Sequence, residues 1–165
     1  MSRIGAVSGR SSSVTPPRGE QPFLYACEIL KPMPSENVEV ARRSFEAWNE
    51  SGVEGSRRVG WTEDAEYHDP PELPDAGVHR GAEAVAARLE EARALLPHQL
   101  EVLDAEGVGD DEVLVIFRLH GGGRSSGVPV EQPMGCLMQI NGGKVSRWRL
   151  FMSHEEAREA AGLLA

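Results

Sequence analysis

The stretch 128-VPVEQPMGCLMQINGGKVSRWRLFM-152 holds two β-rich segments, residues 128–140 and 144–152. They are joined by Asn141-Gly142-Gly143. Asn-Gly between two such segments is the strongest short-range signal for a β-hairpin, because the tight turn needs residues that accept a positive φ. This stretch therefore predicts an antiparallel pair of strands near the end of the chain.

Two more strands are expected upstream, at residues 98–106 and 112–120, with a glycine-rich turn between them. In 112-EVLVIFRLH-120 both faces are apolar at the start, and one face becomes polar at Arg118 and His120. This pattern is typical of a sheet that is covered on one side and lines something on the other.

The first helix is expected from Ser35, which can cap it by accepting a hydrogen bond from a free amide of the first turn. Its apolar stripe is formed by Val38, Ala41, Phe45 and Trp48. These residues predict a helix that packs one face against the rest of the domain.

Gly52 is expected to end this helix, because glycine takes the left-handed conformation without steric cost. A short second helix over residues 53–60 and a brief strand over residues 64–69 follow. Pro70-Pro71 cannot continue a sheet, so residues 72–81 are expected to form a loop.

Residues 82–96 form the clearest helical pattern of the chain, and Pro97 ends it. Ser153 and Glu156 have the spacing of a capping box and open a last short helix. Helices that are segregated from strands indicate an α+β domain. We expect a strongly curved, mainly antiparallel sheet wrapped around the N-terminal helices, with a cavity at its open end.

The composition excludes several classes of protein. The chain has 165 residues, with 17 Lys and Arg against 26 Asp and Glu, and so a net charge of −9. An acidic protein is a poor partner for nucleic acid, and no apolar stretch approaches the ~20 residues of a membrane span. Two cysteines, Cys27 and Cys136, cannot build a disulfide framework, which indicates a cytoplasmic protein. The five histidines lack metal-ligand spacing, and we expect neither metal nor cofactor.

The charge and the prolines divide the chain into two parts. Residues 1–34 hold four basic and two acidic side chains, a net of +2, so residues 35–165 carry −11. Five of the eleven prolines and a run of three serines also lie in the first part. We expect a flexible Pro/Ser-rich leader followed by one domain.

Four segments carry a resemblance to a known family: 36-ENVEVARRSFEAWNESG-52, 61-WTEDAEYHDPPELPDAGVHRG-81, 127-GVPVEQP-133 and 141-NGGKVSRWRLFMSHEEAREAAGL-163. They resemble the SnoaL-like branch of the NTF2-like superfamily, whose cone fold is shared with ketosteroid isomerase and with polyketide cyclases. The resemblance implies this fold and a small-molecule pocket. It does not choose an activity, because the superfamily holds isomerases, cyclases, dehydratases, hydrolases and non-catalytic binders.

The resemblance to the isomerase can be followed at three positions. The isomerase has a general-base aspartate before a proline at the end of its first strand, where this chain has Asp69-Pro70. Its two oxyanion-hole donors, a tyrosine and a protonated aspartic acid, correspond to Phe45 and Cys136 here. Neither side chain is a strong hydrogen-bond donor, so the isomerase mechanism is disfavoured.

Asp69 is therefore the leading catalytic candidate. An apolar cavity mouth favours the neutral form of a carboxyl group and would suit Asp69 to proton transfer near neutral pH. The alternative is a turn cap, because Asp before Pro-Pro is a common turn signal. Strand alternation places Tyr67 on the same face, as a pocket-lining or core residue, and His68 on the opposite face. An imidazole there could assist Asp69, or pack under a loop or against a partner subunit.

The remaining candidates are expected to bind substrate or to be ordinary core residues. Gln132 is expected to point inward as a polar group, and Arg118 would bring a cation to the cavity unless it lies at an edge or a dimer interface. The candidate walls of the pocket are Phe45, Cys136, Met138, Trp148 and Met152.

Two functions follow from this reading. The first is a cofactor-independent isomerase, cyclase or hydrolase that acts on a small apolar or cyclic molecule, with Asp69 as general acid or base. The second is a non-catalytic small-molecule binder or a dimerisation module of the same fold. A homodimer is expected in either case.

Overall fold

The computed structural model describes residues 34–122 and 128–163. The leader predicted at the N-terminus lies outside the described residues, apart from Pro34. The elements follow in the order α3 (Pro34–Val59), β1 (Trp61–His68), β2 (Val78–Arg80), α4 (Ala82–Leu95), β3 (His98–Val108), β4 (Glu112–Gly122), β5 (Pro129–Asn141), β6 (Lys144–Phe151) and α5 (His154–Ala160).

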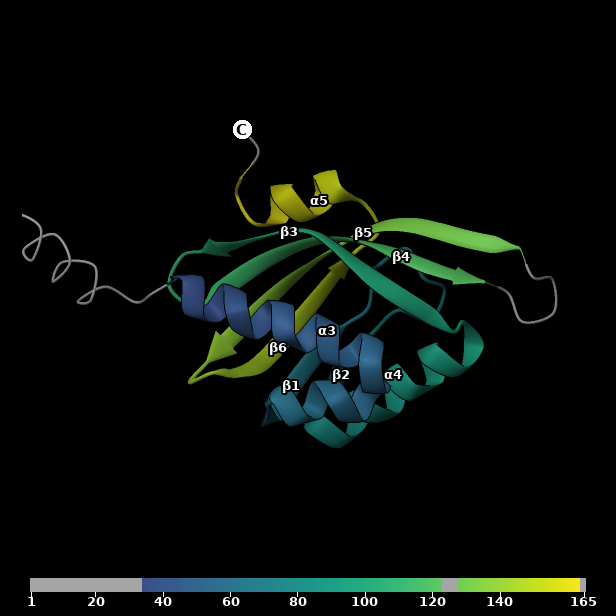
Figure 1. Cartoon of the computed structure of the whole chain (residues 1–165), viewed down its shortest axis with the longest axis horizontal. Coiled ribbons are helices and arrows are strands. Elements are labelled where there is room, and N and C mark those ends of the chain that lie inside the picture. Colours follow the sequence, from purple (N-terminus) through teal and green to yellow (C-terminus); the bar gives the residue numbers. More distant parts are fainter. Residues whose placement is uncertain (1–33, 123–127, 164–165) are drawn as a thin grey trace, which may run out of the picture. The chain divides into compact units, whose positions relative to one another are not determined.

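The six described strands form one curved sheet in the order β2-β1-β6-β5-β4-β3. All neighbouring strands are antiparallel except β1 and β6, which are parallel. Figure 1 shows α3 and α4 against one face of the sheet and α5 against the other. The expected α+β class and the mainly antiparallel sheet are confirmed.

The local turn signals act as the sequence predicts. The β5–β6 hairpin turns at Gly142 and Gly143, whose φ angles are 60° and 80°. Gly52 has φ 67° and ψ −142° and interrupts α3, so that a second helical segment runs on to Val59. A Cβ at Gly52 would meet the Arg93 guanidinium, and the positive φ of this residue disfavours a side chain as well.

Several boundaries differ from the prediction. β1 begins at Trp61 rather than at residue 64, because its pairing with β6 begins at Trp61 opposite Val145. The predicted loop over residues 72–81 contains the three-residue strand β2, which is too short to show alternation and is defined only by its pairing with β1.

The two faces of β4 belong to different hydrophobic clusters. Val113, Val115 and Phe117 lie in the main core between the sheet and the helices α3 and α4. Leu114 and Ile116 pack in a smaller cluster with Ala157 of α5. The apolar start of both faces is therefore explained by helices on both sides of the sheet.

Candidate functional site

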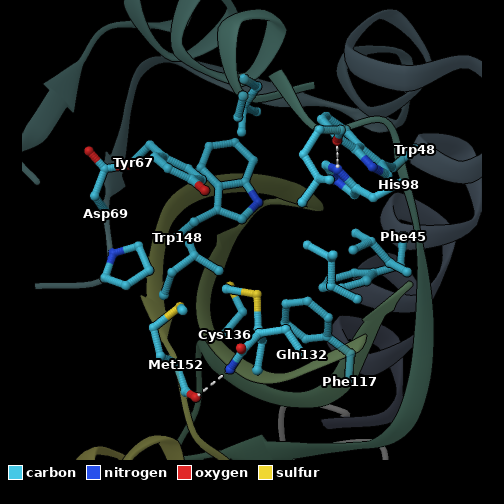
Figure 2. A pocket seen from close by; sticks show the side chains of 18 of the residues that line it. Phe45, Trp48, Tyr67, Asp69, His98, Phe117, Gln132, Cys136, Trp148 and Met152 are labelled. Atoms are coloured by element: carbon cyan, nitrogen blue, oxygen red, sulfur yellow. Dashed lines mark hydrogen bonds between the residues drawn. The ribbon is translucent and has the colours of Figure 1, made fainter. Parts of the chain in front are cut away.

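A cavity of about 390 Å³ lies between α3, α4 and the concave face of the sheet. Most of its lining is apolar, and Figure 2 shows its interior. The lining residues are Ser44, Phe45, Trp48, Ser56, Tyr67, Asp69, Pro70, Leu73, Arg88, Leu89, Ala92, Leu96, His98, Leu100, Phe117, Leu119, Val130, Gln132, Met134, Cys136, Trp148, Leu150 and Met152.

Aromatic side chains form much of the wall. Phe45 of α3 and Phe117 of β4 meet edge to face with 5.0 Å between ring centroids. The rings of Tyr67 and Trp148 lie 6.4 Å apart on the neighbouring strands β1 and β6. Such rings offer a rigid, flat surface to an apolar ligand.

Alternation along the strands brings most of the predicted residues to this cavity. The structure places Tyr67, Asp69, Phe45, Gln132, Cys136, Trp148 and Met152 in the lining. Figure 2 shows Tyr67 and Asp69 at one side of the pocket and His98 at the opposite side.

Asp69 is held by three hydrogen-bond donors. Its Oδ1 accepts from Arg88 Nε at 3.0 Å, and its Oδ2 accepts from His79 Nε2 at 2.8 Å and from the Gly77 amide at 3.2 Å. The Asp69 side chain is only 2% exposed, and in Figure 2 its carboxylate is turned away from Trp148. The surroundings expected for Asp69 were apolar, whereas these donors stabilise the charged carboxylate.

Arg88 is the partner that the sequence reasoning missed. It lies on α4 three residues after the buried Val85, so helical spacing turns it toward the sheet, and its side chain is 11% exposed. Burial alone would lower the pKa of Arg88, but the hydrogen bond and charge of Asp69 outweigh burial and raise it. The spacing from Val85 was the signal that could have identified it.

Tyr67 presents a free hydroxyl group. No hydrogen bond to this hydroxyl occurs within residues 34–122 and 128–163, and Figure 2 shows it directed to the pocket interior. Burial raises the pKa of Tyr67, so the phenol stays neutral and keeps its proton as a hydrogen-bond donor.

Gln132 is only partly free. Its Nε2 donates to the carbonyl oxygens of Pro133 at 2.8 Å and Met152 at 3.0 Å. The amide nitrogen therefore ties β5 to the segment after β6, and the side-chain oxygen remains as an acceptor.

Three predicted site residues lie elsewhere. His68 points to the other face of β1, as alternation requires, and bonds Glu66 at 3.0 Å. Arg118 lies on the face of β4 that α5 partly covers, and it pairs with Glu101 at 3.7 Å and Glu131 at 3.6 Å. Arg118 therefore does not bring a cation to the pocket, and His68 contacts Glu66 rather than Asp69.

Met138 shares a face with Cys136 but is fully buried beneath the pocket, within the main core. It pairs with Val113 and Trp148 on the two neighbouring strands. Met138 therefore packs within the core and does not line the cavity, which is the alternative of ordinary core packing.

Cys136 lines the pocket without offering a reactive thiol. The side chain is 1% exposed, and burial raises the pKa of the thiol, which keeps it protonated. Within the described part of the chain, no group of three or more His, Cys, Asp or Glu side chains could hold a metal ion. None of the described helices is long and apolar enough to cross a membrane.

Comparison with known proteins agrees with this geometry. A family model described as a SnoaL-like domain matches residues 41–148. The sequence matches no curated protein.

Three solved structures illustrate the similarity of fold. A candidate SnoaL-like polyketide cyclase from Jannaschia sp. CCS1 is 23% identical, with a TM-score of 0.63 over 82% of this chain and 96% of that chain. A candidate polyketide cyclase from Xanthomonas campestris pv. campestris is 14% identical, with a TM-score of 0.64 over 78% and 98%. A ketosteroid isomerase-like protein from Catenulispora acidiphila, solved with trimethylamine, is 17% identical, with a TM-score of 0.60 over 76% and 94%.

The curved sheet and the cavity that it encloses with α3 and α4 give the chain an NTF2-like α+β fold. The chain belongs to the SnoaL-like family.

Proposed function

We propose that this protein binds a compact, mainly apolar, cyclic or polyketide-like molecule in the cavity. The observation that carries the proposal is the cavity itself, about 390 Å³ in volume and walled by aromatic side chains from four elements. Ligand sites are typically of this size and combine apolar walls with a few convergent polar groups. The neighbour that holds trimethylamine and the two candidate cyclases support a small-molecule role for the fold.

A substitution that fills the cavity with a larger side chain tests this proposal. Ala92 lines the pocket on α4, whereas Ala94 on the same helix is exposed. Ala92→Phe is expected to weaken the binding of 1-tetralone, a small cyclic ketone, by at least about tenfold, which is about 1.4 kcal/mol. Ala94→Phe is the matched control and should bind as the unchanged protein does.

Tryptophan fluorescence can follow this titration, because Trp48 and Trp148 both line the cavity. Equal affinity of the Ala92→Phe and Ala94→Phe proteins would show that the ligand binds elsewhere. Absence of binding by any tetralone to the unchanged protein would refute the proposed ligand class.

A second function, proton transfer with Asp69 as general acid or base, is favoured by one observation. Asp69 lines the pocket and is hydrogen-bonded to His79, whose side chain is 29% exposed. This contact links the pocket to solvent through two groups that can exchange a proton. The three donors on Asp69 oppose this function, because a carboxylate whose oxygens already accept hydrogen bonds from Arg88, His79 and the Gly77 amide is less available to a ligand.

Hydrogen exchange separates the two functions. 2-Tetralone loses its acidic C–H protons to a general base, so NMR in D₂O measures base catalysis directly. An enzyme of this kind accelerates the exchange, and Asp69→Asn abolishes the acceleration while the ketone still binds. If the ketone binds but its C–H protons exchange no faster than in buffer alone, the protein is a non-catalytic ligand-binding protein.

We propose in addition that the protein is a cytoplasmic homodimer, as the cysteine content and the family resemblance imply. The outer face of β3, β4 and β5 carries an ionic cluster of Glu101, Arg118, His120 and Glu131, which suits a polar interface. Light scattering after size-exclusion chromatography measures the mass, and a monomer at micromolar concentration would contradict the dimer.

A further inference from the structure

His98 stands at the opposite side of the pocket from Tyr67 and was not among the candidates read from the sequence. It is the first residue of β3 and follows Pro97, which ends α4. Its ring lines the cavity, and Figure 2 shows it beside Trp48.

The tautomer of His98 follows from a single hydrogen bond. Nδ1 lies 2.6 Å from the carbonyl oxygen of Leu96, and a carbonyl oxygen can only accept, so Nδ1 carries the proton. In the neutral ring Nε2 then bears a lone pair. None of the described residues donates a hydrogen bond to Nε2.

The surroundings keep this ring neutral. Burial lowers the pKa of His98 and outweighs the Leu96 hydrogen bond, which raises it, and the positive charge of Arg93 adds a smaller lowering effect. The Arg93 guanidinium lies 5.6 Å from the ring centroid of Trp48, against which His98 stacks. At neutral pH Nε2 is therefore an acceptor and not a donor.

His98 is also held rigidly. Its ring stacks on Trp48 with 5.6 Å between centroids and an interplanar angle of 25°. The next residue of α3, Asn49, clamps Leu100 of β3: its Oδ1 accepts from the Leu100 amide and its Nδ2 donates to the Leu100 carbonyl, each at 2.8 Å. These contacts fix the start of β3 on α3. Binding a ligand to His98 therefore costs little conformational entropy, because the acceptor is already in place.

His98 Nε2 is thus an acceptor at one side of the pocket, and the Tyr67 hydroxyl group is a donor at the other. We propose that His98 Nε2 accepts a hydrogen bond from a hydroxyl group of the ligand, and that Tyr67 donates to a carbonyl oxygen at the ligand's other end. The ligand class is then a cyclic hydroxy-ketone with an apolar body, and His98 is the residue that determines specificity for the hydroxyl. This inference rests on the proposed function, because it assumes that the cavity is the binding site.

A pair of probes tests the acceptor. 6-Hydroxy-1-tetralone carries the two groups at opposite ends, and 6-methoxy-1-tetralone has the same skeleton without the donor proton. The unchanged protein should bind the hydroxy compound about three- to tenfold more tightly, the range for one neutral hydrogen bond. In His98→Phe, which keeps a flat ring against Trp48, this preference should disappear while 1-tetralone still binds.

Two further variants separate specificity from damage to the fold. His98→Gln places an amide oxygen near the position of Nε2 and should retain part of the preference. His120→Phe removes an imidazole from the outer face, where it bonds Glu101 at 2.8 Å, and should leave the preference unchanged. A preference that persists in His98→Phe, or that is absent from the unchanged protein, overturns the role of His98.

Tyr67 is tested with the alcohol that lacks the ketone, 5,6,7,8-tetrahydro-2-naphthol. Tyr67→Phe should remove the preference for 6-hydroxy-1-tetralone over this alcohol. Binding of 1-tetralone with no gain from its hydroxyl refutes this inference alone. Failure of every tetralone to bind refutes the proposed function, and the inference with it.

Discussion

Replacing Arg88 by methionine isolates the role of the buried ion pair. The Asp69 side chain is 2% exposed and that of Arg88 11%, and their atoms approach to 3.0 Å. Methionine keeps the apolar stem of the side chain and removes the guanidinium. The Asp69 carboxylate is then left with His79 and the Gly77 amide as partners.

The expected change in the free energy of unfolding follows from the loss of one of the three donors to Asp69. Removing one partner of a buried ion pair costs about 3–5 kcal/mol, because the other charge stays buried and unpaired. Two of the three donors to Asp69 remain, so we expect the lower end, about 3 kcal/mol, or a fall of about 9 °C in Tm for a chain of this size.

Urea unfolding at pH 7, followed by circular dichroism, measures the free energy directly. The double variant Arg88→Met/Asp69→Asn should lose less than the sum of the single losses, by at least about 1 kcal/mol, because it buries no unpaired charge. Glu83→Gln is the control, since it removes the exposed Arg57–Glu83 pair at 2.8 Å and should leave the free energy of unfolding almost unchanged.

The opposite result would contradict a stabilising role of the Arg88–Asp69 ion pair. If Asp69→Asn stabilises the protein and Arg88→Met leaves the unfolding free energy unchanged, the carboxylate is held at an energetic cost. Strain of that kind is expected of an active-site base, not of a structural ion pair. The same variants therefore also help to distinguish a ligand-binding protein from an enzyme that uses Asp69 as a base.

Three further predictions concern other parts of the fold. Gly135→Ala should cost about 1–3 kcal/mol in urea unfolding, because the new methyl group overlaps that of Ala157, and the added change Ala157→Gly should recover part of the loss. Cys136 should resist thiol reagents in the native protein, because burial raises the pKa of its thiol, and peptide mapping that finds rapid labelling would contradict this. The Glu72 side chain raises the pKa of Glu156 above 4.5 by hydrogen bonding, so the pair stabilises the fold at low pH and loses this effect as the pH rises through the raised pKa. Glu72→Gln should therefore raise Tm at pH 7 and give no increase near pH 4, and an equal increase at both pH values would rule out the shared proton.

Local sequence signals were sufficient to predict the helices, strands and turns, and to divide the residues of each strand between its two faces. The Asn141 turn, the helix stop at Gly52 and the cap at Ser153 each depend on the conformational preference of one or two residues, and the structure confirms all three. Alternation with a period of two likewise placed Tyr67 and Gln132 on the inner face, because neighbouring side chains of a strand must point to opposite sides.

The partners of Asp69 could not be obtained in this way. Arg118 was expected to bring a cation to the cavity, yet the cation that pairs with Asp69 is Arg88, 19 residues along the chain on α4. Alternation divides the residues of β4 into two sets but does not say which set faces α3 and which faces α5. That choice depends on how the helices pack.

Local sequence patterns are therefore enough to predict the α+β order, the turns and the division of each strand into two faces, because these follow from preferences over a few neighbouring residues. Only the tertiary structure decided that the Asp69 carboxylate is held by Arg88 and His79, and that His98 offers a free acceptor at the opposite side of the pocket. Asp69 and Arg88 lie 19 residues apart in the chain, and the position of His98 opposite Tyr67 depends on which elements enclose the pocket. Both arrangements exist only once the sheet has curved around its helices.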